Sequence, residues 1–339
     1  MKRNLSKPGQ VTAKFHPPVQ YSPTVSFCIP CYNAGGTIER CLDSVLAEAK
    51  TVPGCEILLV DNASTDNTLA IARKMLEGIT CARIVVNEKN LGRIENWNRC
   101  LELARGQWLR FAMTNNVILG GSTQELIAAT DIGVAFVYSD VARVDKIPNP
   151  IPACPALGRQ TNYTARAMLE HLGRHGNITE TLDGLLFNGG FIRQEGLLFS
   201  PLLPYCADFL FVIDCAGRSY SGCKKIDALT CLMDVGQPRF AATGLNPEKY
   251  YFEARQCADG LAEFLQNKQK AFKFLRHHYA HDYAGQNLTL KQVGLLFRGS
   301  GQLPPYAHAM LTRLRWARVQ LAHFTIRILS KFGLWRTAA

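Results

Sequence analysis

The chain has 339 residues, of which 47% are hydrophobic and 19% are charged. A chain of this length and apolar content can bury a full core, which excludes an intrinsically disordered protein. The formal net charge is +11, but residues 1–282 hold 30 basic and 27 acidic residues, so the excess lies in the remaining tail. The tail interleaves few aromatic residues with its charges and carries no nucleic-acid-binding motif, which argues against a nucleic-acid partner.

The first predicted elements form a parallel βαβ unit after a polar lead-in of residues 1–23. The apolar run Val25–Ile29 predicts a buried strand that stops at Pro30, because proline cannot continue a central ladder. Apolar residues at helical spacing then follow residues 31–36, and residues 56–60 predict a second buried strand that ends at Asp61. Ligands bind such sheets at the carboxyl ends of the strands, where Pro30–Asn33 and Asp61 both fall.

The rest of the chain continues the alternation and then becomes helical. The pattern predicts strands at 82–86, 108–113 and 134–139, a strand pair at 185–193, and helices around 69–76, 97–104, 122–130, 162–171 and 205–217. Residues 147–155 contain four prolines and predict a loop that borders two halves. From residue 246 onward the pattern is helical, and no apolar run is long enough to predict a transmembrane helix.

The twelve cysteines mostly lie within apolar segments, and no hydrophobic signal region precedes them. We therefore expect reduced, buried thiols in a cytoplasmic protein. Cys28 and Cys31 form a C-x-x-C pattern, but no second pair accompanies it, so a redox or zinc role is the weaker interpretation.

Three ordered segments carry a family resemblance. These are P-C-Y-N at residues 30–33, V-D-N-A-S-T-D-N-T at residues 60–68, and N-L-G-R-I-E-N-W-N-R-C-L-E-L-A-R-G-Q-W-L-R-F at residues 90–111. Together they resemble the family 2 glycosyltransferases, which are inverting nucleotide-sugar transferases. The resemblance implies an α/β fold of the GT-A type, with a mostly parallel sheet flanked by helices. It implies a domain over residues 24–245, with a nucleotide-sugar half (24–145) and an acceptor half (146–245), followed by a basic helical extension (246–339).

The resemblance also implies a site for a UDP- or GDP-sugar. The expected nucleotide-binding residues are Pro30, Tyr32, Asn33, Asp61 and Arg93. A purely structural role remains open for Asp61, as the cap of a turn, and for Arg93, as a surface residue, while capping of a helix is the preferred role of Asp66. A Rossmann dehydrogenase is the weaker interpretation, since no G-x-G-x-x-G follows the first strand.

The chain departs from the family after the fourth strand. There the family carries a D-x-D or D-D pair that binds Mg²⁺ or Mn²⁺ with the diphosphate, whereas this chain has Thr114, Asn115 and Asn116. Divalent cations favour carboxylates. Three explanations remain open: a weak metal site of amide oxygens, neutralisation of the diphosphate by Arg or Lys, and lost catalysis. Asp140, Asp145 and the histidines are candidate substitutes that the sequence cannot place.

The acceptor half contributes the expected base. The segment P-Y-C-A-D-F-L resembles the part of the family in which an acid opens a helix facing the acceptor, and this makes Asp208 the candidate general base. Helix capping is the alternative role of Asp208. Asn188, Gly189 and Gly190 are expected to line the acceptor site.

The implied function is inverting transfer of a sugar to a saccharide or lipid-linked acceptor, in bacterial surface polysaccharide or glycolipid synthesis. A non-catalytic relative that binds nucleotide sugar or scaffolds other transferases stays open, as does an interaction protein that acts through its tail. Residues 306–336 combine an apolar stripe with arginines, so they suit either contact with an anionic membrane surface or packing as an ordinary helix.

Overall fold

The computed structural model describes residues 24–155, 158–177, 181–235 and 247–266. The chain divides into two compact units, Met1–Leu172 with Asn177–Gly244, and Gly173–Gly176 with Leu245–Ala339. Helix α8 (Pro247–Leu265) belongs to the second unit. Within the described ranges, no helix is both long and apolar enough to cross a membrane.

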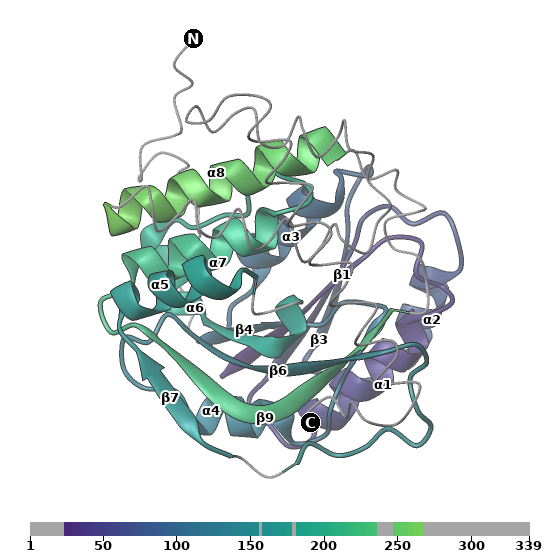
Figure 1. Ribbon diagram of the computed structural model, residues 1–339. Helices are drawn as coiled ribbons and strands as arrows, with labels where there is room; N and C mark the ends of the chain where they lie inside the picture. Colours follow the sequence, from purple (N-terminus) through teal and green to yellow (C-terminus); the bar gives the residue numbers. More distant parts are fainter. Residues whose placement is uncertain (1–23, 156–157, 178–180, 236–246, 267–339) are drawn as a thin grey trace, which may run out of the picture. The chain divides into compact units, whose positions relative to one another are not determined.

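One mixed sheet forms the centre of the first unit (Figure 1). Its strands are β1 (Val25–Cys31), β2 (Glu56–Asp61), β3 (Ala82–Val86), β4 (Trp108–Phe111), β5 (Asn116–Ile118), β6 (Phe136–Val144), β7 (Gln160–Tyr163), β8 (Leu185–Asn188) and β9 (Cys223–Asp234). Their order is β3-β2-β1-β4-β8-β6-β9-β5, with β7 also paired to β9. Strands β1 to β4 are mutually parallel, and β6 and β9 run in the same direction as β4 because antiparallel β8 separates β4 from β6.

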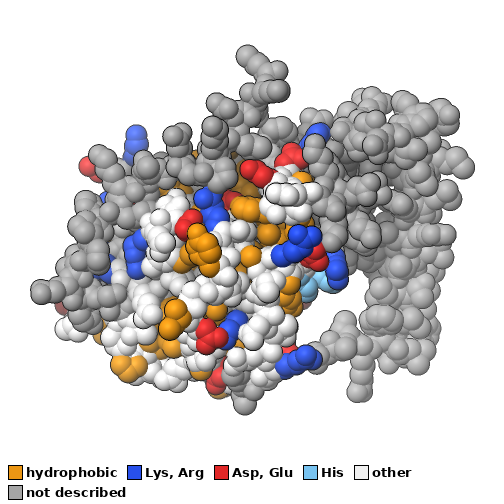
Figure 2. Space-filling model, turned by 90° about the vertical axis from the view of Figure 1, so that its left-hand side faces the viewer, with side chains coloured by type: hydrophobic (Ala, Val, Ile, Leu, Met, Phe, Trp, Pro, Cys, Tyr) orange, Lys and Arg blue, Asp and Glu red, His pale blue; other side chains and the backbone are white. Residues whose placement is uncertain are grey.

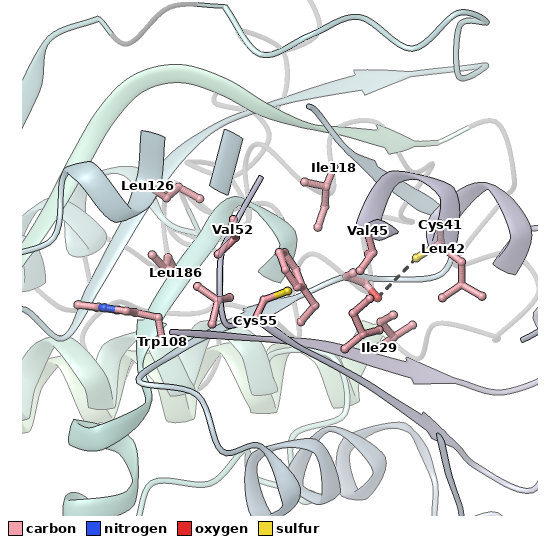
Figure 3. Packing of buried hydrophobic residues seen from close by; sticks show 14 of the residues in the cluster. Ile29, Cys41, Leu42, Val45, Val52, Cys55, Trp108, Ile118, Leu126 and Leu186 are labelled. Atoms are coloured by element: carbon pink, nitrogen blue, oxygen red, sulfur yellow. Dashed lines mark hydrogen bonds between the residues drawn. The ribbon is translucent and has the colours of Figure 1, made fainter. Parts of the chain in front are cut away.

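Helices cover both faces of this sheet, which confirms the expected α/β class. Helices α1 (Ile38–Ala49), α2 (Thr68–Leu76) and α4 (Ser122–Ala128) share one hydrophobic core with alternate residues of β1 and β2. Figure 3 shows this core between α1 and β1, where the Cys41 thiol donates to the Ala112 carbonyl. The other helices are α3 (Arg93–Leu103), α5 (Ala165–His175), α6 (Gly189–Glu195) and α7 (Ala207–Arg218).

The prediction that the first strand stops at Pro30 is wrong, since β1 continues to Cys31. The backbone of Cys28 faces β4, where its carbonyl accepts from Ala112, and Cys31 faces β2, where its carbonyl accepts from Asn62. Because successive residues of a strand face opposite neighbours, Pro30 faces the β4 side. The β1–β4 ladder has already ended there at Cys28. The missing N–H of Pro30 therefore leaves no ladder bond unmade.

Three other element predictions need correction. Residues 160–163 form strand β7, and the helix expected from Asn162 begins at Ala165. The strand pair expected around Gly189 is one strand followed by helix α6. The long strand β9 was not predicted, because its first half carries Lys224 and Asp227, which mask the apolar alternation. The two halves expected at 24–145 and 146–245 share one sheet, since β7, β8 and β9 pair with strands of the first half or with each other.

A fully buried ion pair lies behind the turn between β4 and β5. The side chains of Arg110 (β4) and Glu48 (α1) have no exposed surface, and Arg110 Nη1 lies 3.5 Å from Glu48 Oε2. The Glu48 carboxylate also accepts from the backbone N–H groups of Gly121 and Thr123 at the start of α4. Arg110 donates to the carbonyls of Asp183 and Thr230. The pair thus fastens α1, α4, β4 and β9 together.

Candidate functional site

The two loops after β1 and β2 bind each other at the carboxyl edge of the sheet. Asn33 has a left-handed backbone (φ 47°), which asparagine tolerates well. Its N–H donates to Ser64 Oγ at 2.9 Å, and its Oδ1 accepts from the Thr65 N–H at 2.8 Å. The Tyr32 side chain is exposed beside them. Asn33 therefore joins the two loops, and the exposed Tyr32 side chain lies next to it in the first loop.

Asp66 fixes the start of α2 and the glycine turn. Its carboxylate accepts from the Thr68 hydroxyl and N–H and from the Gly35 N–H. These hydrogen bonds, led by that of the Thr68 hydroxyl, lower the pKa of Asp66. A Cβ on Gly35 would lie 1.8 Å from Asn67 Oδ1, so any other residue there would require the Asn67 side chain to move. The helix-capping interpretation of Asp66 fits this geometry.

Asp61 lies at the end of β2, but its side chain has no exposed surface. One oxygen accepts from the Ser64 N–H at 3.0 Å and the other from the Cys31 thiol at 3.5 Å. Asp61 therefore shapes the second loop in this structure. A nucleoside reaches its carboxylate only if the covering residues move, so the nucleotide role of Asp61 remains a proposal.

A network of asparagines holds the loop after β3 against β2. The sequence did not predict this network. The Asn62 amide donates to Asn90 Oδ1 at 2.9 Å, and Asn62 Oδ1 accepts from Asn87 Nδ2 and from the Leu91 N–H. Asn96 Oδ1 accepts the second hydrogen bond of Asn87 Nδ2. The frequent asparagines among residues 87–96 were the feature of the sequence that could have predicted this network. The network sets the position of Arg93, which begins α3.

Arg93 and Asp208, expected from opposite halves of the domain, lie in one neighbourhood. Arg93 Nη2 donates to the Pro204 carbonyl, and the guanidinium lies 5.2 Å from the centre of the Trp97 ring. Asp208, in the first turn of α7, is partly buried and accepts from the Phe209 N–H at 2.8 Å and from Asn177 Nδ2 at 3.4 Å. Burial raises the pKa of Asp208, while the Phe209 N–H and the positive charge of Arg93 oppose that rise.

An aromatic cluster explains why these two residues meet. The Phe199 ring stacks on Phe211 of α7 at 4.0 Å and meets Trp97 of α3 edge-on at 5.3 Å. Asn98 of α3 brackets the same residue, because its Oδ1 accepts from the Phe199 N–H at 2.8 Å and its Nδ2 donates to the Phe199 carbonyl at 2.9 Å. Phe199 therefore joins α3 to α7 and sets the distance between Arg93 and Asp208.

The turn after β4 is hydrogen-bonded to a buried carboxylate, Asp183, which the sequence alone did not reveal. Asn116 is 1% exposed, and its amide donates to Asp183 Oδ2 at 2.8 Å and to the Thr181 hydroxyl at 3.2 Å. Asp183 also accepts from the Met113 N–H at 2.8 Å and from the Thr181 hydroxyl. Burial raises the pKa of Asp183, and these hydrogen bonds partly offset the rise. Asn116 and Asp183 thus bind each other inside the protein.

The charged group that contacts the exposed side of this turn is a guanidinium. Arg40, in the first turn of α1, donates through Nη2 to the Asn115 carbonyl and to Asp234 Oδ2, each at 3.0 Å. Asp234 ends β9, at the same edge as the carboxyl ends of β1, β2 and β4. Arg40 and Asp234 were not singled out from the sequence, because nothing in the chain links residues so far apart.

The residues at this turn do not fit the Mg²⁺ or Mn²⁺ that the resemblance implies. Hard cations take several oxygen ligands and favour carboxylates. Here Asp183 is buried and already accepts three hydrogen bonds, and Asp234 is paired with Arg40, whose positive charge would repel a metal ion. The substitutes Asp140 and Asp145 are exposed, and Asp140 pairs with Lys225 at 3.0 Å. The described residues contain no group of three His, Cys, Asp or Glu side chains that could hold a metal ion.

Asn188, Gly189 and Gly190 lie at the opposite end of the strands. Asn188 pairs with Trp108, which pairs with Val25 at the start of β1, about 20 Å along the strand from Cys31. Asn188 caps α6, with its Oδ1 accepting from the Phe191 N–H. Gly189 packs so closely that a Cβ would lie 2.6 Å from the Gly106 carbonyl oxygen. These residues have a structural role in the local backbone, and the structure does not bring them close to the other candidate site residues.

The cysteines follow the structural interpretation, since all twelve are free. Cys28 and Cys31 are three residues apart on a strand, so their side chains lie on opposite faces of the sheet. Burial raises the pKa of both thiols. This geometry rules out a shared metal or a disulfide between these two residues.

The described residues on the face shown in Figure 2 indicate no further binding surface. On that face, basic, acidic and hydrophobic side chains are interspersed and not gathered by kind (Figure 2). Residues 306–336, expected to contact a membrane or to pack as a helix, lie outside the described residues.

The comparisons with known proteins agree on the N-terminal part. The model of glycosyl transferase family 2 matches residues 26–114. An uncharacterised protein of Mycobacterium tuberculosis (strain CDC 1551 / Oshkosh) is 41% identical over 117 residues, which cover 34% of this chain and 35% of that protein. A PGL/p-HBAD biosynthesis glycosyltransferase of Mycobacterium bovis (strain BCG / Pasteur 1173P2) is 32% identical over 108 residues, covering 32% and 41%. The chain thus spans only about two fifths or less of these relatives' length.

Among solved structures, residues 1–349 of TarS from S. aureus in complex with UDP give a TM-score of 0.63 at 17% identity, covering 89% of this chain and 91% of that chain. At this identity the likeness shows the fold, which is of the GT-A type. The matched segment contains both loops, the asparagine network and the first turn of α3. By this match and these relatives, residues 26–114 are a segment of the glycosyl transferase family 2 type.

Proposed function

We propose that the protein transfers a sugar from a UDP- or GDP-sugar to a saccharide or lipid-linked acceptor, with inversion at the anomeric carbon. One observation carries this proposal: Arg93, from the expected nucleotide segment, bonds the Pro204 carbonyl four residues before Asp208. A base candidate therefore lies near one of the nucleotide candidates, Arg93. The similarity of the chain to a PGL/p-HBAD biosynthesis glycosyltransferase supports a glycolipid or surface-polymer setting.

In the proposed reaction, Asp208 accepts the proton of the acceptor hydroxyl as that oxygen attacks the anomeric carbon. The bond from that carbon to the diphosphate breaks in the same step, and the nucleoside diphosphate leaves with the electron pair. A carboxyl with a raised pKa is better matched to this proton transfer than one with its usual pKa, provided that it is ionised at the working pH. Tyr32, Asn33 and Asp61 are the proposed contacts for the nucleoside, with Pro30 shaping the loop.

The test is release of nucleoside diphosphate from a panel of UDP- and GDP-sugars, with lipid extracts and oligosaccharides as acceptors. We expect one donor to turn over, and Asp208→Asn to reduce kcat by at least about 100-fold while nucleotide affinity stays within about threefold. Asp227→Asn is the matched control, because Asp227 is exposed on β9 and pairs with the neighbouring Lys225. Its kcat is expected to equal that of the wild type. An equal loss in both variants, or retention of anomeric configuration, would contradict the proposal.

A second function remains supported by two observations: among the residues that the structure describes, the carboxylates at the Asn115–Asn116 turn are all engaged, and Asp61 has no exposed surface. Both suit a non-catalytic relative that binds nucleotide sugar or scaffolds other transferases. Tight binding of one UDP- or GDP-sugar, with no turnover against any acceptor, would favour this function.

A further inference from the structure

A guanidinium lies at the turn between β4 and β5, where the family resemblance implies a divalent cation. Arg40 Nη2 lies 3.0 Å from the Asn115 carbonyl oxygen, directly at the turn that lacks carboxylates. One third of the Arg40 side chain is exposed, compared with 15% for Asp234. Arg40 is therefore a positive charge that reaches solvent at the carboxyl edge of the sheet.

The hydrogen-bonding capacity of Arg40 is only partly used. Both of its hydrogen bonds pass through Nη2, and among the described residues its buried Nε has no partner. A guanidinium offers five N–H donors in a planar fork that matches phosphate oxygens. A diphosphate at this turn would find unused donors, and its two or more negative charges would outweigh the single charge of Asp234 in competing for the guanidinium.

The two carboxylates at the turn, Asp183 and Asp234, are both engaged by other groups, so neither is a ready ligand for a metal ion. Asp183 is buried beneath the turn and is occupied by Met113, Asn116 and Thr181. Asp234 lies against Arg40, so a cation placed at this carboxylate would be only a few ångström from a like charge. The charge that a metal ion would supply is thus already present on the protein.

We propose that Arg40 neutralises the diphosphate of the nucleotide sugar, in place of a divalent cation, and that Asp234 holds the guanidinium ready until the nucleotide binds. This inference rests on the proposed function and adds the residue that receives the leaving group. As the glycosidic bond to the diphosphate breaks, negative charge builds on the leaving oxygen, and a fixed guanidinium stabilises that charge. Nucleotide binding is then independent of divalent metal.

The first arm of the test measures affinity by calorimetry for uridine, UMP and UDP, and for guanosine, GMP and GDP, in Mn²⁺ and in EDTA. We expect the wild-type protein to bind the diphosphate equally in both buffers, within about twofold. Arg40→Gln is expected to weaken the diphosphate by about 10- to 100-fold, the monophosphate less, and the nucleoside by less than about twofold. A purely structural role of Arg40 would lower all three affinities together.

Two further variants sharpen the result. Arg40→Lys keeps the charge without the fork, so it is expected to recover part of the phosphate-dependent affinity. Asp234→Asn removes the competing carboxylate, so it should strengthen diphosphate binding, whereas loss of a Mn²⁺-dependent affinity in this variant would identify Asp234 as a metal ligand and overturn the inference. Arg99→Gln is the matched control, because Arg99 is similarly exposed and pairs with Glu102 on α3.

The two proposals fail differently. The proposed role of Arg40 is wrong, and the nucleotide site stands, if the nucleotides bind but the diphosphate adds the same affinity in wild type and in Arg40→Gln. The same conclusion follows if diphosphate binding requires Mn²⁺. If no nucleoside, monophosphate or diphosphate binds in either buffer, the proposed function is wrong and the role of Arg40 falls with it.

Discussion

The buried pair of Glu48 and Arg110 gives a sharp prediction about stability. Glu48→Gln leaves the Arg110 guanidinium without a counter-charge at a site with no exposed surface. It also replaces one of the two carboxylate oxygens, which now accept hydrogen bonds from the N–H groups of Gly121 and Thr123, with an amide N–H₂ that cannot accept. Removing one partner of such a pair costs about 3–5 kcal/mol of the free energy of unfolding. Arg110→Met strands the carboxylate and is expected to cost a similar amount.

The double variant tests the reasoning. With both charges gone, no uncompensated charge remains, so Glu48→Gln with Arg110→Met should cost at least about 2 kcal/mol less than the sum of the two single variants. The assay is urea unfolding followed by far-UV circular dichroism and tryptophan fluorescence. Arg99→Gln, which removes an exposed pair with Glu102, should change the free energy of unfolding by less than about 1 kcal/mol. Additivity of the two buried substitutions within about 0.5 kcal/mol would refute the account.

Three further outcomes follow from the site. Arg93→Gln removes a positive charge that lowers the pKa of Asp208, so the acidic limb of the kcat/KM profile should move to higher pH. An unchanged acidic limb would mean that Asp208 is not the catalytic base. The pKa of Asp183 is raised in the folded protein, so its contribution to stability is greatest at low pH and is lost as pH rises through that pKa. In urea unfolding from about pH 4 to 7, the free energy of unfolding of Asp183→Asn should therefore increase relative to that of the wild type. Asn98→Ala leaves the buried backbone of Phe199 unpaired, so its free energy of unfolding should fall by about 1–3 kcal/mol, and no loss would mean that water replaces the amide.

Local sequence patterns were enough for the first half of the sheet. Apolar runs of strand length and helices at i, i+3, i+4 spacing predicted β2 and β3 to within one residue and gave the buried face of α1. These elements are consecutive along the chain, so short-range periodicity carries the information. The family segments added the loops at residues 30–33 and 60–68, which do bind each other through Asn33 and Thr65.

Long-range pairing decided the rest, and local patterns carry little trace of it. Strand β9 is buried between β6, β5 and β7, yet its charged residues hide that environment in the sequence. The sequence made Asp208 a candidate base, but its nearness to Arg93 depends on Phe199 packing between two helices that are more than one hundred residues apart.

The sequence by itself determined the α/β class, the family segment and the absence of carboxylates at Asn115 and Asn116, because each is written in consecutive residues. Only the tertiary structure decided what replaces those carboxylates. It placed Asp183 under the turn, Arg40 and Asp234 beside it, and Asn188 with its glycines about 20 Å away. Charges act through space, so residues 40, 115, 183 and 234 share one electrostatic environment that no local pattern reveals.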